Sequence, residues 1–126
     1  MHGKVTIITP LYNCSEFLDE TLNSVLAQTY QNWEVIMVDD CSSDNSVLIA
    51  QEFVEKDHRI KLIQLEKNSG AAVARNKAIE AATGRFIAFL DSDDLWHPEK
   101  LEKQINLIKQ VGLANYLQAQ MGTEAP

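Results

Sequence analysis

Three carboxylates fall within four positions of the sequence. Asp91, Asp93 and Asp94 directly follow the apolar residues 86–90. Two carboxylates ~4 Å apart repel each other by about 4 kcal/mol at the effective dielectric constant of ~20 that suits protein sites. Such a cluster takes up protons or binds a cation, and hard divalent cations prefer oxygen ligands. The spacing therefore indicates a metal site.

The apolar run before these acids indicates which element positions them. The run is too short for a helix, and it lies between Gly84 and the acids. It is typical of a fully buried strand in a parallel sheet. The acids then lie at the C-terminal end of that strand. Gly84 is expected to end the preceding helix as a left-handed cap.

Strand-like and helix-like segments alternate along the chain. The expected strands are 5–9, which Pro10 ends, 33–38, 60–65 and 85–90. The expected helices are 15–29, one that ends near Lys56, 71–82, and one from Pro98 to about Gly112. This order predicts an α/β fold with a mostly parallel sheet, helices on both faces and right-handed crossovers. The more polar strand 60–65 is expected near an edge.

The same topology brings four loops to one edge of the sheet, where ligands of such sheets bind. These loops are 10–13, 39–43, 67–70 and 91–94. Asp39 and Asp40 directly follow the strand 33–38 and should share a pocket with Asp91 and Asp93. A solvated loop, the alternative for this pair, is less consistent with its place directly after an apolar strand.

Composition limits the class of protein and its partners. A chain of 126 residues, 45% of them hydrophobic, suits one domain. Eighteen acidic against eleven basic residues give a net charge of −7, which argues against nucleic-acid binding. The longest apolar runs are too short to span a bilayer, and Met1 leads almost directly into a strand, so we expect no signal peptide and a cytoplasmic location. Cys14 and Cys41 are expected to be free thiols.

Several other kinds of site lack support. The first strand–helix loop contains no glycine, which excludes a Gly-rich dinucleotide or Walker loop there. Leu95 and Trp96 stand where an EF-hand requires an oxygen ligand and a glycine. His2, His58 and His97 are expected on the surface rather than in a catalytic triad. A phospho-receiver domain fits less well, because its acidic pair follows the first strand and here the pair ends the second.

Six segments together carry a resemblance to a known family. They are VTIITPLYN (5–13), QTY (28–30), WEVIMVDDCSS (33–43), NSGAAVARNK (68–77), ATGRFIAFLDSDDL (82–95) and WHP (96–98). In this order and spacing they resemble the nucleotide-sugar-binding half of family 2 glycosyltransferases, which have the Rossmann-like GT-A fold. The resemblance covers roughly residues 4–110. Residues 1–112 are therefore expected to form the domain, and 113–126 a weakly ordered helix or tail.

The resemblance implies a set of nucleotide-binding residues. They are Pro10, Tyr12, Asp39, Asp40, Asn68, Gly70, Arg75, Asp91 and Ser92. By this match Pro10 and Tyr12 flank the base, and Asp40 accepts a hydrogen bond from a base N–H. Asp39 helps to shape that corner. Arg75 either reaches the diphosphate or pairs with the acids of the pocket.

The resemblance also assigns the metal ligands. In the Asp-x-Asp element, Asp93 is the direct ligand of Mg²⁺ or Mn²⁺, and Asp91 contacts the ribose or reaches the metal through water. So sparse a site should bind the metal weakly without the nucleotide, because Mg²⁺ takes one or two carboxylates plus substrate phosphates. Asp94 is expected to assist or to cap the next helix. Trp96 is either a core anchor or a wall of the sugar pocket.

The implied reaction is the metal-dependent transfer of a sugar, with inversion, from a nucleoside diphosphate sugar to an acceptor hydroxyl. A UDP-sugar is the expected donor, and a saccharide or lipid-linked molecule the expected acceptor, which would place a full-length enzyme in the cytoplasm or at the inner membrane face. The general base is expected beyond residue 126, so the chain alone should be inactive. The alternative is a nucleotide-binding or assembly module without catalysis. Open edge strands favour self-association.

Overall fold

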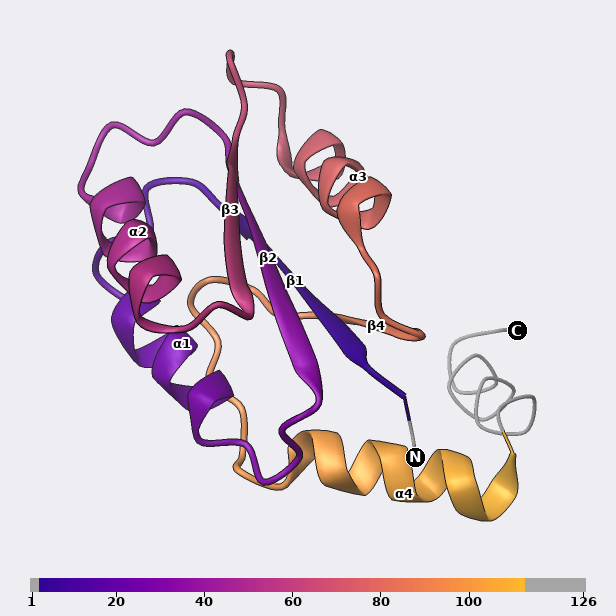
Figure 1. Ribbon diagram of the computed structural model, residues 1–126. Coiled ribbons are helices and arrows are strands. Elements are labelled where there is room, and N and C mark those ends of the chain that lie inside the picture. Colours follow the sequence, from indigo (N-terminus) through magenta and orange to yellow (C-terminus); the bar gives the residue numbers. More distant parts are fainter. Residues whose placement is uncertain (1–2, 113–126) are drawn as a thin grey trace, which may run out of the picture.

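The computed structural model describes residues 3–112, which form a four-stranded sheet with helices on both faces (Figure 1). The elements are β1 (Val5–Leu11), α1 (Leu18–Leu26), β2 (Trp33–Asp39), α2 (Ser46–Lys56), β3 (Ile60–Gln64), α3 (Ala71–Ala81), β4 (Phe86–Phe89) and α4 (Lys100–Val111). The strand order is β3-β2-β1-β4, and every neighbouring pair is parallel. The predicted fold class is confirmed, and β3 lies at an edge as its polarity indicates.

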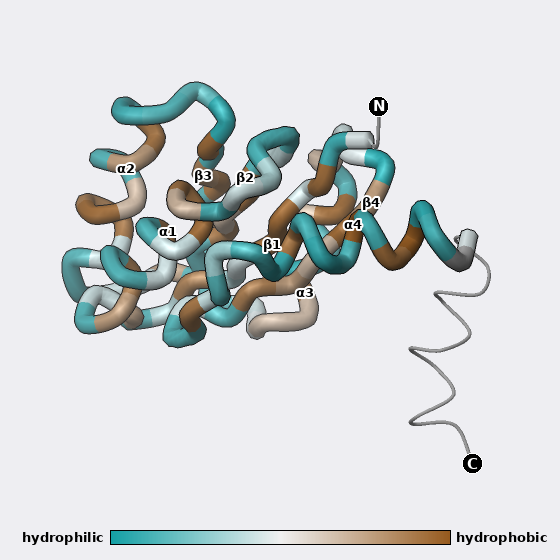
Figure 2. Tube along the Cα trace, turned by 90° about the horizontal axis from the view of Figure 1, so that it is seen from below, coloured by the Kyte–Doolittle hydropathy of each residue, from teal (hydrophilic) through white to brown (hydrophobic). Residues whose placement is uncertain are grey.

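Two apolar clusters hold the helices to the sheet. On one face, α1, α2 and α4 contribute the buried side chains Leu22, Phe53 and Leu101. On the other face, α3 sets Ala74 and Ala78 against β1 and β2. Their small side chains let this helix lie close to the strands. Figure 2 shows the hydrophobic stretches of the strands between α1 and α2 on one side and α3 on the other.

The prediction that Pro10 ends the first strand is wrong, because β1 continues to Leu11. The carbonyl of Ile8 accepts a hydrogen bond from Leu90 N–H, and the carbonyl of Leu11 accepts one from Asp40 N–H. Alternate residues of β1 therefore bond to opposite neighbours, and the missing N–H of Pro10 falls on the β4 side. Since β4 has ended there, Pro10 lies within the strand without removing a ladder bond.

β4 is an edge strand, and the prediction that it is fully buried is wrong. It pairs only with β1, so within residues 3–112 its other backbone edge has no strand partner. Ile87 and Phe89 are in register with Thr6 and Ile8, on the face that carries α3. Because α3 packs on β1 and β2, Ile87 and Phe89 stay 43% and 55% exposed. An apolar run alone does not distinguish a buried strand from an apolar edge strand.

Gly84 has a different role from the predicted left-handed cap. α3 ends at Ala81, and the φ of Gly84 lies outside the left-handed region, so the prediction is wrong. A Cβ on Gly84 would lie 2.5 Å from the Thr6 hydroxyl oxygen and 2.8 Å from the Lys4 carbonyl oxygen. Glycine is required because the backbone passes directly against β1.

A buried carboxylate ties together the strands at the opposite end from the predicted pocket. Glu34 on β2 is 3% exposed. Its Oε2 accepts hydrogen bonds from the Thr6 hydroxyl (2.6 Å) and from the N–H (2.7 Å) and hydroxyl (2.9 Å) of Thr83. Its Oε1 lies 3.2 Å from Lys61 Nζ and 3.8 Å from Lys4 Nζ. Burial raises the pKa of Glu34, but these hydrogen bonds outweigh burial and lower the pKa to about 2.

The histidines, the cysteines and the hydrophobicity of the helices were also predicted from the sequence. His58 and His97 are exposed, and both cysteines are free, with Cys14 buried and Cys41 exposed. Across residues 3–112, no helix combines the length and the apolar character needed to cross a bilayer. His2 and the tail predicted at 113–126 lie outside the described residues.

Candidate functional site

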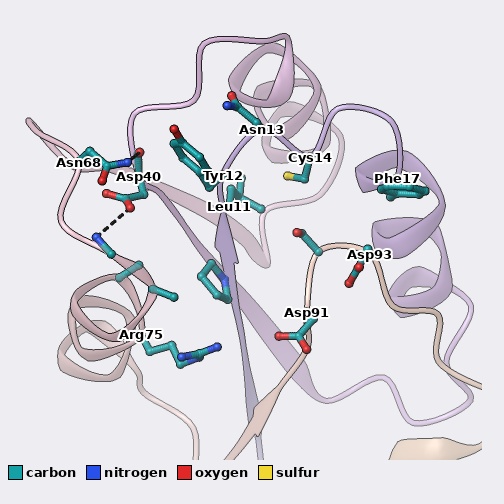
Figure 3. A pocket seen from close by; sticks show the side chains of 15 residues that line it. Leu11, Tyr12, Asn13, Cys14, Phe17, Asp40, Asn68, Arg75, Asp91 and Asp93 are labelled. Atoms are coloured by element: carbon teal, nitrogen blue, oxygen red, sulfur yellow. Dashed lines mark hydrogen bonds between the residues drawn. The ribbon is translucent and has the colours of Figure 1, made fainter.

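Four loops meet at the C-terminal edge of the sheet and line a cavity of about 600 Å³ (Figure 3). They follow β1, β2, β3 and β4, as the topology predicts. Of the predicted site residues, Asp39 alone does not line this cavity. The lining residues are Pro10, Tyr12, Asp40, Asn68, Gly70, Arg75, Asp91, Ser92 and Asp93, together with Leu11, Asn13, Cys14, Phe17, Ala71 and Ala74.

The acidic side chains stand on two sides of the cavity. In Figure 3, Asp40 and Asn68 lie on one side, Asp91 and Asp93 lie on the other, and Tyr12 lies between them. The two acidic groups come from loops that follow β2 and β4, which β1 separates in the sheet. The arrangement suits an elongated ligand with polar groups at both ends.

Asp40 is buried and holds the loop that follows β3. Its Oδ1 accepts a hydrogen bond from Ser69 N–H (2.6 Å) and its Oδ2 accepts one from Gly70 N–H (2.9 Å). The Asn68 side-chain amide donates to the Asp40 carbonyl oxygen at 3.1 Å. Gly70 has a φ of +96°, which a residue with a Cβ rarely adopts. A carboxylate oxygen accepts more than one hydrogen bond, so Asp40 can still accept one from a ligand.

Asp39 faces away from the cavity. It is 2% exposed, and its Oδ1 and Oδ2 accept hydrogen bonds from the hydroxyl (2.6 Å) and the N–H (3.0 Å) of Ser42. Successive strand residues point to opposite sides, so Asp39 and Asp40 cannot both face one ligand while the strand continues through Asp39. The geometry gives Asp39 a place in the turn rather than a contact with the nucleotide.

The loop after β4 presents its carboxylates to the cavity. Asp91 and Asp93 are exposed, and the half-buried Ser92 between them is fixed through its carbonyl, which accepts a hydrogen bond from the Thr21 hydroxyl on α1 at 2.9 Å. The loop is closed by Asp94 N–H, which donates to the Asp91 carbonyl oxygen at 3.0 Å. The two carboxylates therefore lie on a turn whose backbone is fixed by hydrogen bonds.

The donor set of this loop fits a sparsely ligated hard cation. Among the described residues 3–112, no three His, Cys, Asp or Glu side chains converge to hold a metal by themselves. Asp91 and Asp93 offer two carboxylates beside the cavity, which is what Mg²⁺ uses when phosphate oxygens and water complete its shell. The residues present fit a cation that arrives with a phosphorylated ligand.

Arg75 provides a positive charge inside the cavity. In Figure 3 its side chain reaches from α3 into the cavity on the side of Asp91. Within the part of the chain that the structure describes, Arg75 makes no ion pair with an acidic side chain. Of the two predicted roles, contact with an anionic ligand is therefore open to it, and pairing with the pocket acids is not observed.

The structure also bears on the expected roles of Asp94 and Trp96. Asp94 is exposed and does not line the cavity, and α4 begins only at Lys100 with Glu99 at its N-cap, so Asp94 does not cap that helix. Trp96 is 8% exposed and belongs to the apolar core, which decides in favour of a core anchor.

Sequence reasoning missed several lining residues. Phe17 is 45% exposed and lies beside Asp93 in Figure 3. Asn13 has a φ of +48°, which asparagine adopts more readily than most residues. The residue type itself was a signal for Asn13, because an asparagine in a loop often occupies a backbone position with positive φ. No local pattern distinguishes Phe17 from a core residue at the start of an amphipathic helix.

Comparison with known proteins gives a family match and close relatives. The model of glycosyl transferase family 2 matches residues 6–124. The putative teichuronic acid biosynthesis glycosyltransferase TuaG of Bacillus subtilis is 52% identical over 106 residues, covering 84% of this chain and 42% of that protein. The Escherichia coli protein WfgD, a UDP-Glc:α-D-GlcNAc-diphosphoundecaprenol β-1,3-glucosyltransferase, is 52% identical over 104 residues, covering 82% and 40%. The chain thus spans about two fifths of the length of these curated relatives.

Solved structures share the fold. Staphylococcus aureus TarS 1–349 in complex with UDP has a TM-score of 0.80 and 37% identity, with 85% of this chain and 32% of that chain covered. A further TarS structure contains UDP-GlcNAc. The mannosyltransferase PcManGT of Pyrobaculum calidifontis, in complex with GDP-Man and Mn²⁺, has a TM-score of 0.80 and 27% identity, with 86% and 33% covered. The cavity thus belongs to a fold in which nucleotide sugars bind.

Proposed function

The chain belongs to glycosyl transferase family 2, and from this premise we propose that it is the donor-binding part of an inverting, metal-dependent glycosyltransferase. One observation carries the proposal. Asp40 and Asp93, which follow different strands, line the same cavity of about 600 Å³. Had they faced opposite sides of the molecule, no single nucleotide sugar could contact both. A cavity of this volume accommodates a small-molecule ligand or cofactor.

The donor is a nucleoside diphosphate sugar, with a UDP-sugar favoured. TarS in its complexes holds UDP and UDP-GlcNAc, PcManGT holds GDP-Man, and WfgD is named for a UDP-Glc donor. The name of WfgD also includes a diphosphoundecaprenol acceptor, which supports a lipid-linked or saccharide acceptor for a full-length enzyme of this kind. With such an acceptor the enzyme would work in the cytoplasm, at the inner membrane face.

The chain's own residues position the donor by stacking, hydrogen bonding and charge. Tyr12, 56% exposed at the cavity, offers a face on which the base stacks. Asp40 accepts a hydrogen bond from a base N–H while it keeps the loop 67–70 in place. Arg75, free of acidic partners, balances diphosphate charge. Asp93 would hold Mg²⁺ or Mn²⁺ directly, with Asp91 beside it. When bound, the cation supplies Lewis-acid neutralisation of the charge that develops on the departing diphosphate.

Transfer also requires a general base near the acceptor hydroxyl. Within residues 3–112 the carboxylates that line the cavity are Asp40, Asp91 and Asp93, and each already has a binding role. We therefore propose that residues 1–126 alone bind the donor without completing transfer. The second candidate function, a nucleotide-binding module, rests on the same observation. Sugar transfer catalysed by the purified 126-residue chain would contradict both the proposed lack of transfer and the second candidate function.

Donor binding should depend on the cation. We expect the 126-residue chain to bind UDP at least tenfold more tightly with Mn²⁺ than with EDTA, because the phosphates complete the cation's shell. Isothermal titration calorimetry with UDP, GDP and CDP, each with and without Mn²⁺, measures this and ranks the bases. No heat of binding for any nucleotide would contradict the proposed function.

Self-association should follow from the free edge of β4. Among residues 3–112 the outer backbone of β4 has no strand partner, and with the exposed Ile87 and Phe89 it forms an apolar edge that favours pairing between chains. We expect light scattering to show a mass that rises with concentration for the wild type and a monomer for Phe89→Lys. Leu48→Lys is the matched control, since Leu48 is 61% exposed on α2, away from this edge. A monomeric wild type at every concentration would exclude the edge contact.

A further inference from the structure

The loops after β1 and β2 are joined by side-chain hydrogen bonds that hold three consecutive amides. The N–H groups of Asn13, Cys14 and Ser15 all donate to side chains of the other loop. Their acceptors are the hydroxyl of Ser42 at 2.9 Å, the hydroxyl of Ser46 at 2.8 Å and Oδ2 of Asp44 at 3.1 Å. Backbone amides outside regular structure need such partners. The loop that carries Tyr12 is thus fixed by the loop that carries Asp40.

Ser42 connects this junction to the sheet. Its hydroxyl donates to Asp39 Oδ1 at 2.6 Å and accepts the Asn13 N–H at 2.9 Å. Asp39 is 2% exposed and is the last residue of β2, so the bond chain runs from the sheet to the residue after Tyr12. Neither Ser42 nor Asp39 lines the cavity. They therefore act on a ligand through neighbours that do line the cavity, such as Asn13 and the adjoining Tyr12.

Asn13 contributes the turn that directs Tyr12 to the cavity. Its φ of +48° lies in the left-handed region, at a bend of the chain, and its Oδ1 accepts a hydrogen bond from Ser43 N–H at 2.8 Å. The Ser43 hydroxyl approaches the same oxygen at only 3.3 Å. Tyr12 itself is 56% exposed, so few packing contacts hold its side chain. Its position therefore depends on the hydrogen-bonded turn at Asn13. Fixing a loop before binding removes an entropic cost that the ligand would otherwise meet.

We propose that Ser42 is a positioning residue that fixes Tyr12 for the base, acting through Asp39 and Asn13 without touching the nucleotide. This inference rests on the proposed function, because it names what orders the base end of that same site. It assigns to Asp39 and Ser42 a role in pre-organisation rather than in ligand contact. The cation end of the cavity is held by a different contact, the hydrogen bond from the Thr21 hydroxyl to the Ser92 carbonyl oxygen.

The test compares two adjacent serines. Ser42→Ala removes both hydroxyl bonds, whereas Ser43→Ala removes only the 3.3 Å contact and leaves the Ser43 N–H in place. By calorimetry in Mn²⁺, we expect Ser42→Ala to weaken UDP binding about tenfold. Its affinity for Mn²⁺–pyrophosphate, which lacks a base, should stay unchanged. Ser43→Ala should match the wild type, and Ser42→Thr, which keeps a hydroxyl, should restore binding.

Each result bears on the inference. If Ser42→Ala weakened the binding of UDP and of pyrophosphate equally, the inference would be overturned, because the whole site would have lost structure. If Ser42→Ala weakened neither, the inference would also be overturned, because Ser42 would have no role in binding. If the wild type binds no UDP, the proposed function fails, and amide hydrogen exchange then tests the junction alone. Faster exchange at Asn13 and Cys14 in Ser42→Ala than in Ser43→Ala would support the junction. Equal exchange rates would overturn it.

Discussion

Replacing Glu34 with alanine is expected to lower the free energy of unfolding by about 3 kcal/mol at neutral pH. The substitution leaves the Thr83 N–H and the Thr6 hydroxyl without their acceptor, and it leaves Lys61 without its partner. These groups join β1, β2, β3 and the segment before β4, so their loss affects the whole sheet. Urea unfolding followed by circular dichroism measures the change. A loss of about 0.5 kcal/mol or less, the usual size of a surface effect, would show that the network contributes little.

The same carboxylate makes stability depend on pH, and Glu34→Gln isolates this dependence. The pKa of Glu34 falls from 4.5 to about 2 on folding. A depressed pKa contributes stability that is fully present above the unfolded pKa and is lost as pH falls toward the folded pKa. At about 1.4 kcal/mol per pKa unit, the contribution is about 3 kcal/mol.

The difference in stability between the wild type and Glu34→Gln should therefore be constant above about pH 4.5 and should shrink between pH 4.5 and 2. The other acids are common to both proteins, so their titration cancels in the comparison. A difference that stays constant down to pH 2 would contradict the assigned pKa.

Asp93→Asn is expected to weaken Mn²⁺-dependent UDP binding about a hundredfold, equivalent to about 2.7 kcal/mol. The amide keeps the size of the side chain and removes the charge that attracts the cation. Binding in EDTA should change little, because the base and the loop 67–70 are untouched. Calorimetry with and without Mn²⁺ separates the two effects.

Asp94→Asn is the matched control for this experiment. Asp94 is the next residue, is exposed and does not line the cavity. We expect it to bind UDP and Mn²⁺ as the wild type does. If Asp93→Asn behaved like Asp94→Asn, the assignment of Asp93 as the cation ligand would be wrong.

The convergence of the site residues at one edge of the sheet could be predicted from the sequence, because it follows from the order of strands and helices. Asp40 and Asp93 each end an apolar strand-like run, and parallel strands joined by helices place such ends at one edge. Tyr12, Asn68 and Gly70 lie in loops of the same edge, so they reach the cavity with them. A pattern of alternating elements is sufficient for this level of prediction.

The details that failed depend on contacts between distant residues. Glycine is required at position 84 because Thr6 and Lys4, far away in the sequence, leave no room for a Cβ. Its place just after a helix led to the wrong prediction of a helix cap. The exposure of Phe89 depends on α3 packing on β1 and β2 rather than on β4. Asp39 and Asp40 look alike in the sequence, and the path of the chain at the end of β2 decides which one faces the cavity.

The central claim is that one nucleotide spans the cavity from Asp40 to a cation at Asp93. A crystal structure of the chain grown with UDP and Mn²⁺, with anomalous data collected at the manganese edge, tests it most directly. We predict the uracil ring beside Tyr12 and Asp40, and a manganese peak within coordination distance of Asp93 and the diphosphate. A manganese peak away from Asp93, or a uracil ring that contacts neither Tyr12 nor Asp40, would contradict the claim.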